Sequence, residues 1–304
     1  MKNTVLSKIR KRKIYEIINA LNSRARIAFR IKNKRVYAEY AMTIKYKFLE
    51  KKYTEKIDKG VDVCKKRSKN NVIWMCWLQG IDNAPPLIQS CVRSIRTAAK
   101  NSNYEVILLS EETISNYIEL PEYIIKKRGK GSIGPAHYTD IIRTELLCKY
   151  GGGWIDCTVL CTAEIIPNYI VNSKLFFFQD INWGNIDQPS SILSNWLIFS
   201  ESNNPILLLT RDLLFEYWKE YDFPVHYFFY HMFFTMSAER YKEEWSRVPL
   251  YSNEPSRILS RESNASFNTA RWEQILRMTD IHKLNWKKEY DDNETMMKYI
   301  IDNF

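Results

Sequence analysis

Three consecutive glycines at residues 151–153 separate a helix-like segment from an apolar, strand-like run, which requires a tight reversal between the two. Pro135 suits the first turn of that helix, because its missing N–H would have no intrahelical partner there. Glycine ends helices readily, because it adopts the left-handed conformation without a Cβ clash. A buried helical stripe is indicated by the spacing of Ile141, Ile142, Leu146 and Leu147. We therefore predict a helix over 136–149 and a strand over 153–160.

Charged side chains gather around this predicted reversal. His137, Asp140 and Arg143 fall on one helical face, because residues three apart are neighbours on a helix. Asp156 follows the glycines, where the chain leaves the predicted sheet, and open α/β sheets place ligand-binding groups at such positions. Two carboxylates and a guanidinium suit a metal-bound diphosphate and its sugar. The alternative is an ordinary solvated Asp140–Arg143 pair beside an aspartate that caps a turn.

The rest of the chain alternates predicted strands with predicted helices. We expect further strands at 72–78, 104–109, 175–180 and 195–200. We expect further helices at 85–100, 111–118, 203–221, 225–242 and 268–279. This alternation predicts an α/β fold with a mostly parallel sheet and helices on both faces. The one boundary falls near residue 70, between a basic helical extension over 1–70 and a larger domain over 71–304.

Charge is distributed unevenly along the chain. Residues 1–70 hold 22 Lys or Arg and 6 Asp or Glu, a net charge of +16, whereas the remainder carries −6. The basic part has an apolar helical stripe formed by Ile14, Ile17, Ile18 and Leu21. Such a segment predicts contact with an anionic membrane surface through residues 1–60; nucleic-acid binding and a helix packed on the body are the alternatives. We expect no nucleic-acid partner, because the acidic body lacks a basic groove or a reading motif.

Composition and cysteine spacing indicate a soluble, cytoplasmic protein. No apolar run is long enough to span a bilayer, and the N-terminus lacks the uninterrupted apolar core of a secretory signal. The six cysteines form no CxxC pair and no zinc-finger spacing, so they are expected to be reduced thiols. With the basic segment, this places the protein in the cytoplasm, peripheral on the inner face of the cell membrane.

Residues 129–134 match the GxGxxG pattern of dinucleotide-binding proteins. That function requires a strand running directly into the first glycine. The preceding residues 123–128 are too short and basic for a buried strand. We therefore expect a loop here, which could close over donor phosphates, and not a dinucleotide site.

The central segment resembles a known family. Residues 137–158, HYTDIIRTELLCKYGGGWIDCT, are similar to the SDxxRxxxLxxxGGxWxDxT pattern of bacterial capsular polysaccharide synthesis proteins. These are relatives of glycosyltransferase family 32 and of the DXD sugar-binding transferases. Two further matches are IWMCWLQG at 73–80, followed by APP at 84–86, and IHKL at 281–284. The resemblance extends from Val72 to about Lys287.

The resemblance implies a GT-A-like nucleotide-sugar transferase over residues 71–304. The donor it implies is a UDP-sugar, and the acceptor is a saccharide or lipid-linked saccharide of a growing surface polysaccharide, with retention of anomeric configuration. By position in the family pattern, Trp77 and Gln79 would bind the nucleotide side of the donor. Asp140 and Arg143 would contact the donor sugar, and Asn195 would orient the donor or acceptor.

The same resemblance implies a divalent cation, Mn²⁺ or Mg²⁺, bound by Asp156 and His282. Asp156 matches the first acid of the DXD motif, and catalysis is expected from Asp140, Arg143 and Asp156. Thr158 departs from the motif, because many DXD enzymes carry a second aspartate there, and a neutral hydroxyl is a poorer ligand for hard cations. This departure leaves a non-catalytic partner in polysaccharide assembly as an alternative, beside a basic nucleic-acid-binding protein.

Overall fold

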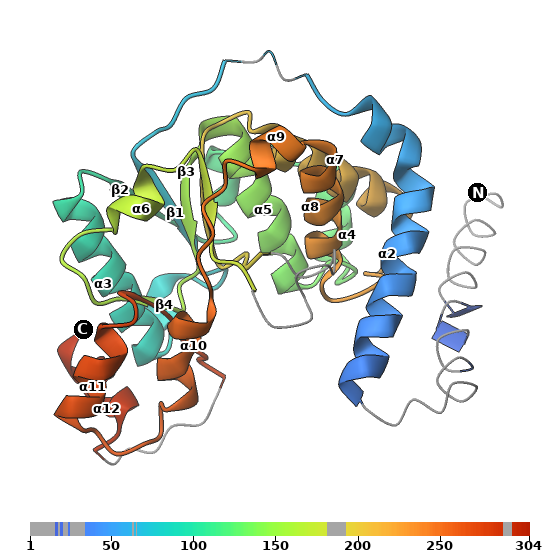
Figure 1. The fold of residues 1–304 in the computed structure, drawn as a ribbon. Helices are drawn as coiled ribbons and strands as arrows, with labels where there is room; N and C mark the ends of the chain where they lie inside the picture. The colour runs from blue at the N-terminus through green and yellow to red at the C-terminus, as the bar shows by residue number, and fades with distance from the viewer. Residues whose placement is uncertain are drawn as a thin grey trace.

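A five-stranded sheet with the order β2-β1-β3-β6-β5 forms the centre of the fold (Figure 1). The computed structural model describes residues 34–62, 66–180, 193–287 and 294–304, with Cys64 and positions 16, 17, 19, 20 and 24. The strands are β1 (Val72–Cys76), β2 (Glu105–Leu109), β3 (Gly152–Ile155), β5 (Leu175–Phe177) and β6 (Leu197–Ser200). β1 is parallel to β2 and β3, whereas β6 is antiparallel to its neighbours β3 and β5. The sheet is therefore mixed and mostly parallel, which confirms the predicted α/β class.

Helices cover both faces of this sheet, as the sequence predicted. Successive residues of β1 alternate between the faces, with Ile73 and Met75 on one side and Trp74 and Cys76 on the other. The first side packs on α3 (Pro86–Asn101) and α6 (Asn168–Val171). The second side packs on α5 (Pro135–Tyr150), α7 (Pro205–Glu220) and α8 (Phe229–Arg240). Figure 1 shows α3 and α5 on opposite sides of the strands.

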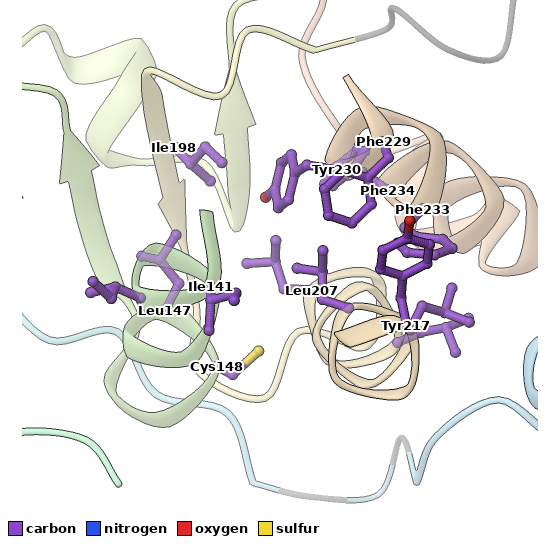
Figure 2. Packing of buried hydrophobic residues seen from close by; sticks show 14 of the residues in the cluster. Ile141, Leu147, Cys148, Ile198, Leu207, Tyr217, Phe229, Tyr230, Phe233 and Phe234 are labelled. Atoms are coloured by element: carbon purple, nitrogen blue, oxygen red, sulfur yellow. The ribbon is translucent and has the colours of Figure 1, made fainter. Parts of the chain in front are cut away.

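Aromatic side chains fill the space between α5, α7 and α8. Figure 2 shows Ile141 and Leu147 of α5 lying opposite Leu207 and Tyr217 of α7, with the rings of α8 above them. The fully buried rings of α8 are Phe229, Tyr230, Phe233 and Phe234. This packing holds the inner face of α5 away from water, which matters for the charged residues on the same helix.

The helix α2 (Lys34–Lys59) packs against α7 and α8 on the outside of this layer. Tyr46, Leu49 and Tyr53 are buried in the same core cluster, and the Tyr46 hydroxyl donates to a Glu239 carboxylate oxygen at 2.7 Å. The predicted boundary at residue 70 stays a prediction. Of the predicted apolar stripe, only Ile17 is among the described residues; Ile14, Ile18 and Leu21 lie outside them. Within the described part of the chain, none of the helices is both long and apolar enough to cross a membrane.

The three glycines fit a reversal that leaves no room for side chains. α5 ends at Tyr150, and β3 enters the sheet between β1 and β6 at once. Gly152 has a φ of +88°, and a Cβ there would lie 2.4 Å from the Val72 carbonyl oxygen. A Cβ on Gly153 would lie 2.5 Å from the Phe199 ring of β6. The predicted helix-to-strand reversal is confirmed, and close backbone contact explains the glycines better than helix termination alone.

The single strand predicted over 153–160 is wrong. β3 ends at Ile155, and β4 (Val159–Cys161) pairs with β7 (Ile281–Lys283) in a separate antiparallel sheet. Between them the chain turns, with the Val159 N–H donating to the Asp156 carbonyl oxygen at 3.0 Å. Asp156 therefore stands at a strand end, as expected, because the chain changes sheets there.

The remaining elements surround this framework. The residues predicted as the helix 111–118 form only the short 3-10 helix η2 (Ile114–Asn116), and another such turn is η1 (Ile81–Asn83). Gly129 is the last residue of the helix α4 (Glu122–Gly129), so a helix and not a strand leads into residues 129–134, and the dinucleotide pattern is not met. The remaining helices are α9 (Lys242–Trp245), α10 (Glu254–Arg261), α11 (Thr269–Leu276) and α12 (Met296–Asn303). Through α10, α11 and α12, the C-terminal part packs against α3 and β4.

Candidate functional site

A cavity of about 880 Å³ opens at the carboxyl ends of β1 and β3. Its walls come from the segment after β1, the first turns of α5, the break between β3 and β4, and the segment after β7. The volume suits a small ligand, since such sites measure roughly 300–1,000 Å³. The position also agrees with the rule that open α/β sheets bind ligands beyond the carboxyl ends of their strands. Six of the seven predicted site residues line this cavity: Trp77, Gln79, Asp140, Arg143, Asp156 and Asn195.

Arg143 joins the two predicted carboxylates into one ionic chain, Asp140–Arg143–Asp156. Its Nη1 lies 2.5 Å from Asp140 Oδ1, and its Nη2 lies 3.2 Å from Asp156 Oδ1. The Asn195 amide donates to the same Asp140 oxygen at 2.9 Å. Among the described residues, the only polar group near Asp140 Oδ2 is the His137 imidazole, 3.7 Å away, which is too far for a hydrogen bond. This oxygen therefore retains capacity to accept a hydrogen bond from a ligand.

The alternative of a solvated Asp140–Arg143 pair is wrong. Their side chains are only 9% and 5% exposed, because α8 and the sheet cover this face of α5. The Arg143 guanidinium carbon lies 5.1 Å from the Trp154 ring centroid and 6.0 Å from that of Tyr230. Within the described structure, the buried Arg143 Nε has no hydrogen-bond partner. A buried, stacked guanidinium fixes the carboxylates it contacts, and removing one member of such a pair is costly.

Asp156 is held from three directions. Its Oδ1 accepts from the Trp154 indole N–H at 2.9 Å as well as from Arg143, and its Oδ2 accepts from Lys283 Nζ at 2.9 Å. Burial alone would raise the pKa of this carboxyl, but the charges of Lys283 and Arg143 and the hydrogen bonds from Trp154 and Lys283 outweigh it. The pKa is therefore lowered, and Asp156 is ionised at neutral pH.

His282 is not among the residues that line the cavity. Side chains alternate along β7, so His282 lies on the same side as its partner Leu160, and Lys283 lies on the side of Val159. The His282 ring is fully buried, with Nε2 3.3 Å from the Thr162 hydroxyl. Its role as a metal ligand remains a prediction, but the residue of this element that reaches Asp156 is Lys283.

The environment of His282 gives a testable pH dependence. Burial lowers the pKa of this imidazole to about 4, from its ordinary value of 6.5. The unfolded chain therefore binds this proton at a higher pH than the folded protein, and stability falls as pH drops from 6.5 towards 4. Between pH 7 and pH 5, the free energy of unfolding should fall by about 2 kcal/mol more in the wild type than in His282→Gln. Urea unfolding at both pH values measures this; equal pH dependence in wild type and variant would contradict it.

An aromatic pair forms one rim of the cavity. The rings of Trp77 and Trp286 meet edge to face with centroids 5.4 Å apart, and Trp286 is 39% exposed. Gln79 lies on the same rim and is exposed. Partly exposed indoles beside polar groups suit a planar, apolar ligand surface such as a nucleobase.

The residues present do not fit the predicted divalent cation. Thr158 supplies only a neutral hydroxyl, His282 is on the other side of β7, and both Asp156 oxygens are engaged. Among the described residues, no group of three or more His, Cys, Asp and Glu side chains could hold a metal ion. At a diphosphate site Mg²⁺ and Mn²⁺ take one or two carboxylates besides the phosphate oxygens, and here the carboxylate oxygens of Asp156 are occupied by Trp154, Arg143 and Lys283.

A model of the capsular polysaccharide synthesis protein family matches residues 24–302, nearly the whole chain. The chain belongs to this family. Among curated proteins it is similar to the O-glycosyltransferase braB of Annulohypoxylon truncatum, with 23% identity over 171 residues. That match covers 48% of this chain and 37% of the relative, so it spans little more than a third of the relative's length. Among solved structures it is similar to the PaToxG glycosyltransferase, with a TM-score of 0.37 and 15% identity over 68% of this chain and 80% of that one.

The cavity of this family member also contains residues that sequence reasoning did not select. Lys283 is next to the selected His282, and Trp154 lies between the glycines and Asp156. Successive side chains of a strand point to opposite sides, so only one of His282 and Lys283 can face the cavity. Which of them does so depends on the register between β4 and β7. Trp286 and the exposed Arg257 carry no local signal that would have identified them.

Proposed function

We propose that this protein transfers a sugar from a nucleotide-sugar donor, a UDP-sugar, to a growing capsular or other surface polysaccharide. The observation that carries the proposal is the buried Asp140–Arg143–Asp156 chain opening onto a cavity of about 880 Å³. Family membership and the distant similarity to an O-glycosyltransferase support a transferase. We further propose that the catalytic domain has a GT-A-like fold and that transfer retains the anomeric configuration of the donor sugar.

The proposed reaction replaces one bond at the anomeric carbon of the donor sugar. The bond to the diphosphate oxygen breaks, and its electron pair leaves with the nucleoside diphosphate. A hydroxyl oxygen of the acceptor forms the new bond, and its proton passes to the departing diphosphate oxygen. Asp140 Oδ2 would accept a hydrogen bond from a sugar hydroxyl, because its other oxygen already serves Arg143 and Asn195. Arg143 would hold both carboxylates in place and complement charge that develops during transfer.

The rim formed by Trp77 and Trp286 would take the nucleobase, with Gln79 beside it. In this arrangement the sugar would lie deeper in the cavity, near Asp140, and the diphosphate would lie between the nucleobase and the sugar. The acceptor would be a saccharide or a lipid-linked saccharide. In this proposal the basic segment 1–60, whose helix α2 also packs on the body, contacts the anionic inner face of the cell membrane and keeps the cytoplasmic enzyme near that acceptor.

Incubation with a panel of nucleotide sugars tests the proposed function. We expect at least one of them to raise the melting temperature and to be hydrolysed slowly when no acceptor is present. Replacing Asp140 by Asn should remove most of this hydrolysis, because the amide nitrogen cannot accept the hydrogen bond from the sugar. Release of nucleoside diphosphate measures turnover, and thermal unfolding of each variant confirms its fold.

The matched control is Asp302→Asn on α12, which changes an exposed carboxylate outside the cavity. Its hydrolysis rate should equal that of the wild type. If no nucleotide sugar binds or turns over, with or without Mn²⁺, the proposed function is wrong. Binding without any turnover would favour a non-catalytic partner in polysaccharide assembly, the role that Thr158 suggested.

A further inference from the structure

The pairing of β4 with β7 fixes the position of Lys283. Lys283 is the partner of Val159, and the Leu284 N–H donates to the Thr158 carbonyl oxygen at 2.9 Å. The ammonium group consequently lies at the Asp156-x-Thr158 turn, 2.9 Å from Asp156 Oδ2 and within hydrogen-bond contact of the Thr158 hydroxyl. These are the two side chains that correspond to the acidic positions of a DXD motif.

The ammonium therefore lies where a cation held by Asp156 and Thr158 would bind. A divalent cation on these two oxygens would lie beside a positive charge, and like charges at such distances repel strongly in a partly buried site. A carboxylate in place of Thr158 would offset that repulsion, but the hydroxyl does not. The same hydroxyl is a suitable hydrogen-bond acceptor for an ammonium donor.

We propose that the Lys283 ammonium, and not a divalent cation, neutralises the diphosphate of the donor. This inference rests on the proposed function and assigns a binding residue to it. A lysine ammonium has three N–H donors, of which Asp156 and Thr158 engage two. No described residue accepts from the third, which can reach a ligand because Lys283 lines the cavity and its side chain is 21% exposed.

The charge balance of the cavity agrees with this role. Three carboxylates and five cations line the cavity, which leaves the lining with a net positive charge; they are Asp140, Asp156 and Asp180, and Arg143, Arg257, Arg261, Lys283 and Lys287. A diphosphate would therefore enter a cavity whose carboxylates are already neutralised by the protein's own cations. When the sugar leaves, Lys283 would stabilise the negative charge that remains on the departing nucleoside diphosphate.

Titration calorimetry of the full chain with UDP, GDP, ADP and dTDP tests this, in EDTA and again in Mn²⁺. We expect the wild type to bind one of these diphosphates in EDTA, with little gain in affinity from Mn²⁺. Lys283→Met should weaken that binding in EDTA by about ten- to one-hundred-fold, the loss expected for a hydrogen bond to a charged group. Lys283→Arg keeps the charge and should lose less.

Lys298→Met is the matched control, because Lys298 is half-exposed on α12 and outside the cavity. It should bind like the wild type, and urea unfolding of each variant separates loss of binding from loss of fold. Wild-type binding that requires Mn²⁺, or unchanged affinity in folded Lys283→Met, overturns the role of Lys283 and leaves the proposed function standing. If no diphosphate binds the wild type in either condition, the proposed function itself is contradicted, and this inference with it.

Discussion

Replacing Arg143 by Met is expected to reduce sugar transfer by at least about 1,000-fold and to lower the free energy of unfolding by about 3–5 kcal/mol. Both effects have one cause. The guanidinium bridges Asp140 and Asp156 in a largely buried position, so its removal leaves Asp140 buried without its cation and frees Asp156 from its contact with α5. Nucleotide-sugar hydrolysis and urea unfolding measure the two quantities on the same preparation.

Two other substitutions separate charge from geometry at this position. Arg143→Lys keeps a positive charge but cannot contact both carboxylates with a planar fork, so it should recover part of the stability and little of the activity. Arg277→Met removes an exposed arginine with a long ion pair to Glu273, 3.5 Å away, and should change stability by less than about 0.5 kcal/mol. An Arg143→Met protein with wild-type stability and near-normal turnover would refute the bridging role.

The part of the site on α5, with Asp140 and Arg143, could be predicted from local sequence. Proline, the apolar stripe and the glycines set the limits of α5, and they placed Asp140 and Arg143 on one helical face. The burial of that face was not predictable from the same residues, because it depends on the aromatic side chains of α8, more than eighty positions further along. A solvated Asp140–Arg143 pair is what an isolated helix would have, and the prediction is wrong because tertiary packing buries this face of α5.

The second part of the site depends on long-range strand pairing. The segment 153–160 is apolar apart from Asp156 and Thr158 and was predicted as one strand, whereas the pairing of β4 with β7 divides it at Asp156. The same pairing decides whether His282 or Lys283 faces the cavity, because a shift of one residue in register exchanges the two. Family resemblance selected the element that forms β7, and the register of β7 places Lys283, and not the selected His282, in the lining of the cavity.

The position of Asp156 between two cations leads to the second large effect. We expect Asp156→Asn to reduce turnover by at least about 100-fold, because the carboxylate orients both Arg143 and Lys283 towards the ligand. The fold should persist, because this side chain is 25% exposed and the amide oxygen can still accept from the Trp154 indole. Turnover of a nucleotide sugar and the urea midpoint give the two measurements.

The affinity for a nucleoside diphosphate distinguishes the expected effect of Asp156→Asn from general damage to the site. Removing the negative charge leaves the cavity with one more uncompensated cation, so nucleoside diphosphate affinity in EDTA should stay the same or increase while turnover falls. Loss of turnover together with loss of a Mn²⁺-dependent gain in affinity would show instead that Asp156 binds the diphosphate through a cation, as the DXD resemblance implied. Unchanged turnover would mean that the carboxylate only anchors Lys283, and that the chemistry depends on Asp140 and Arg143 alone.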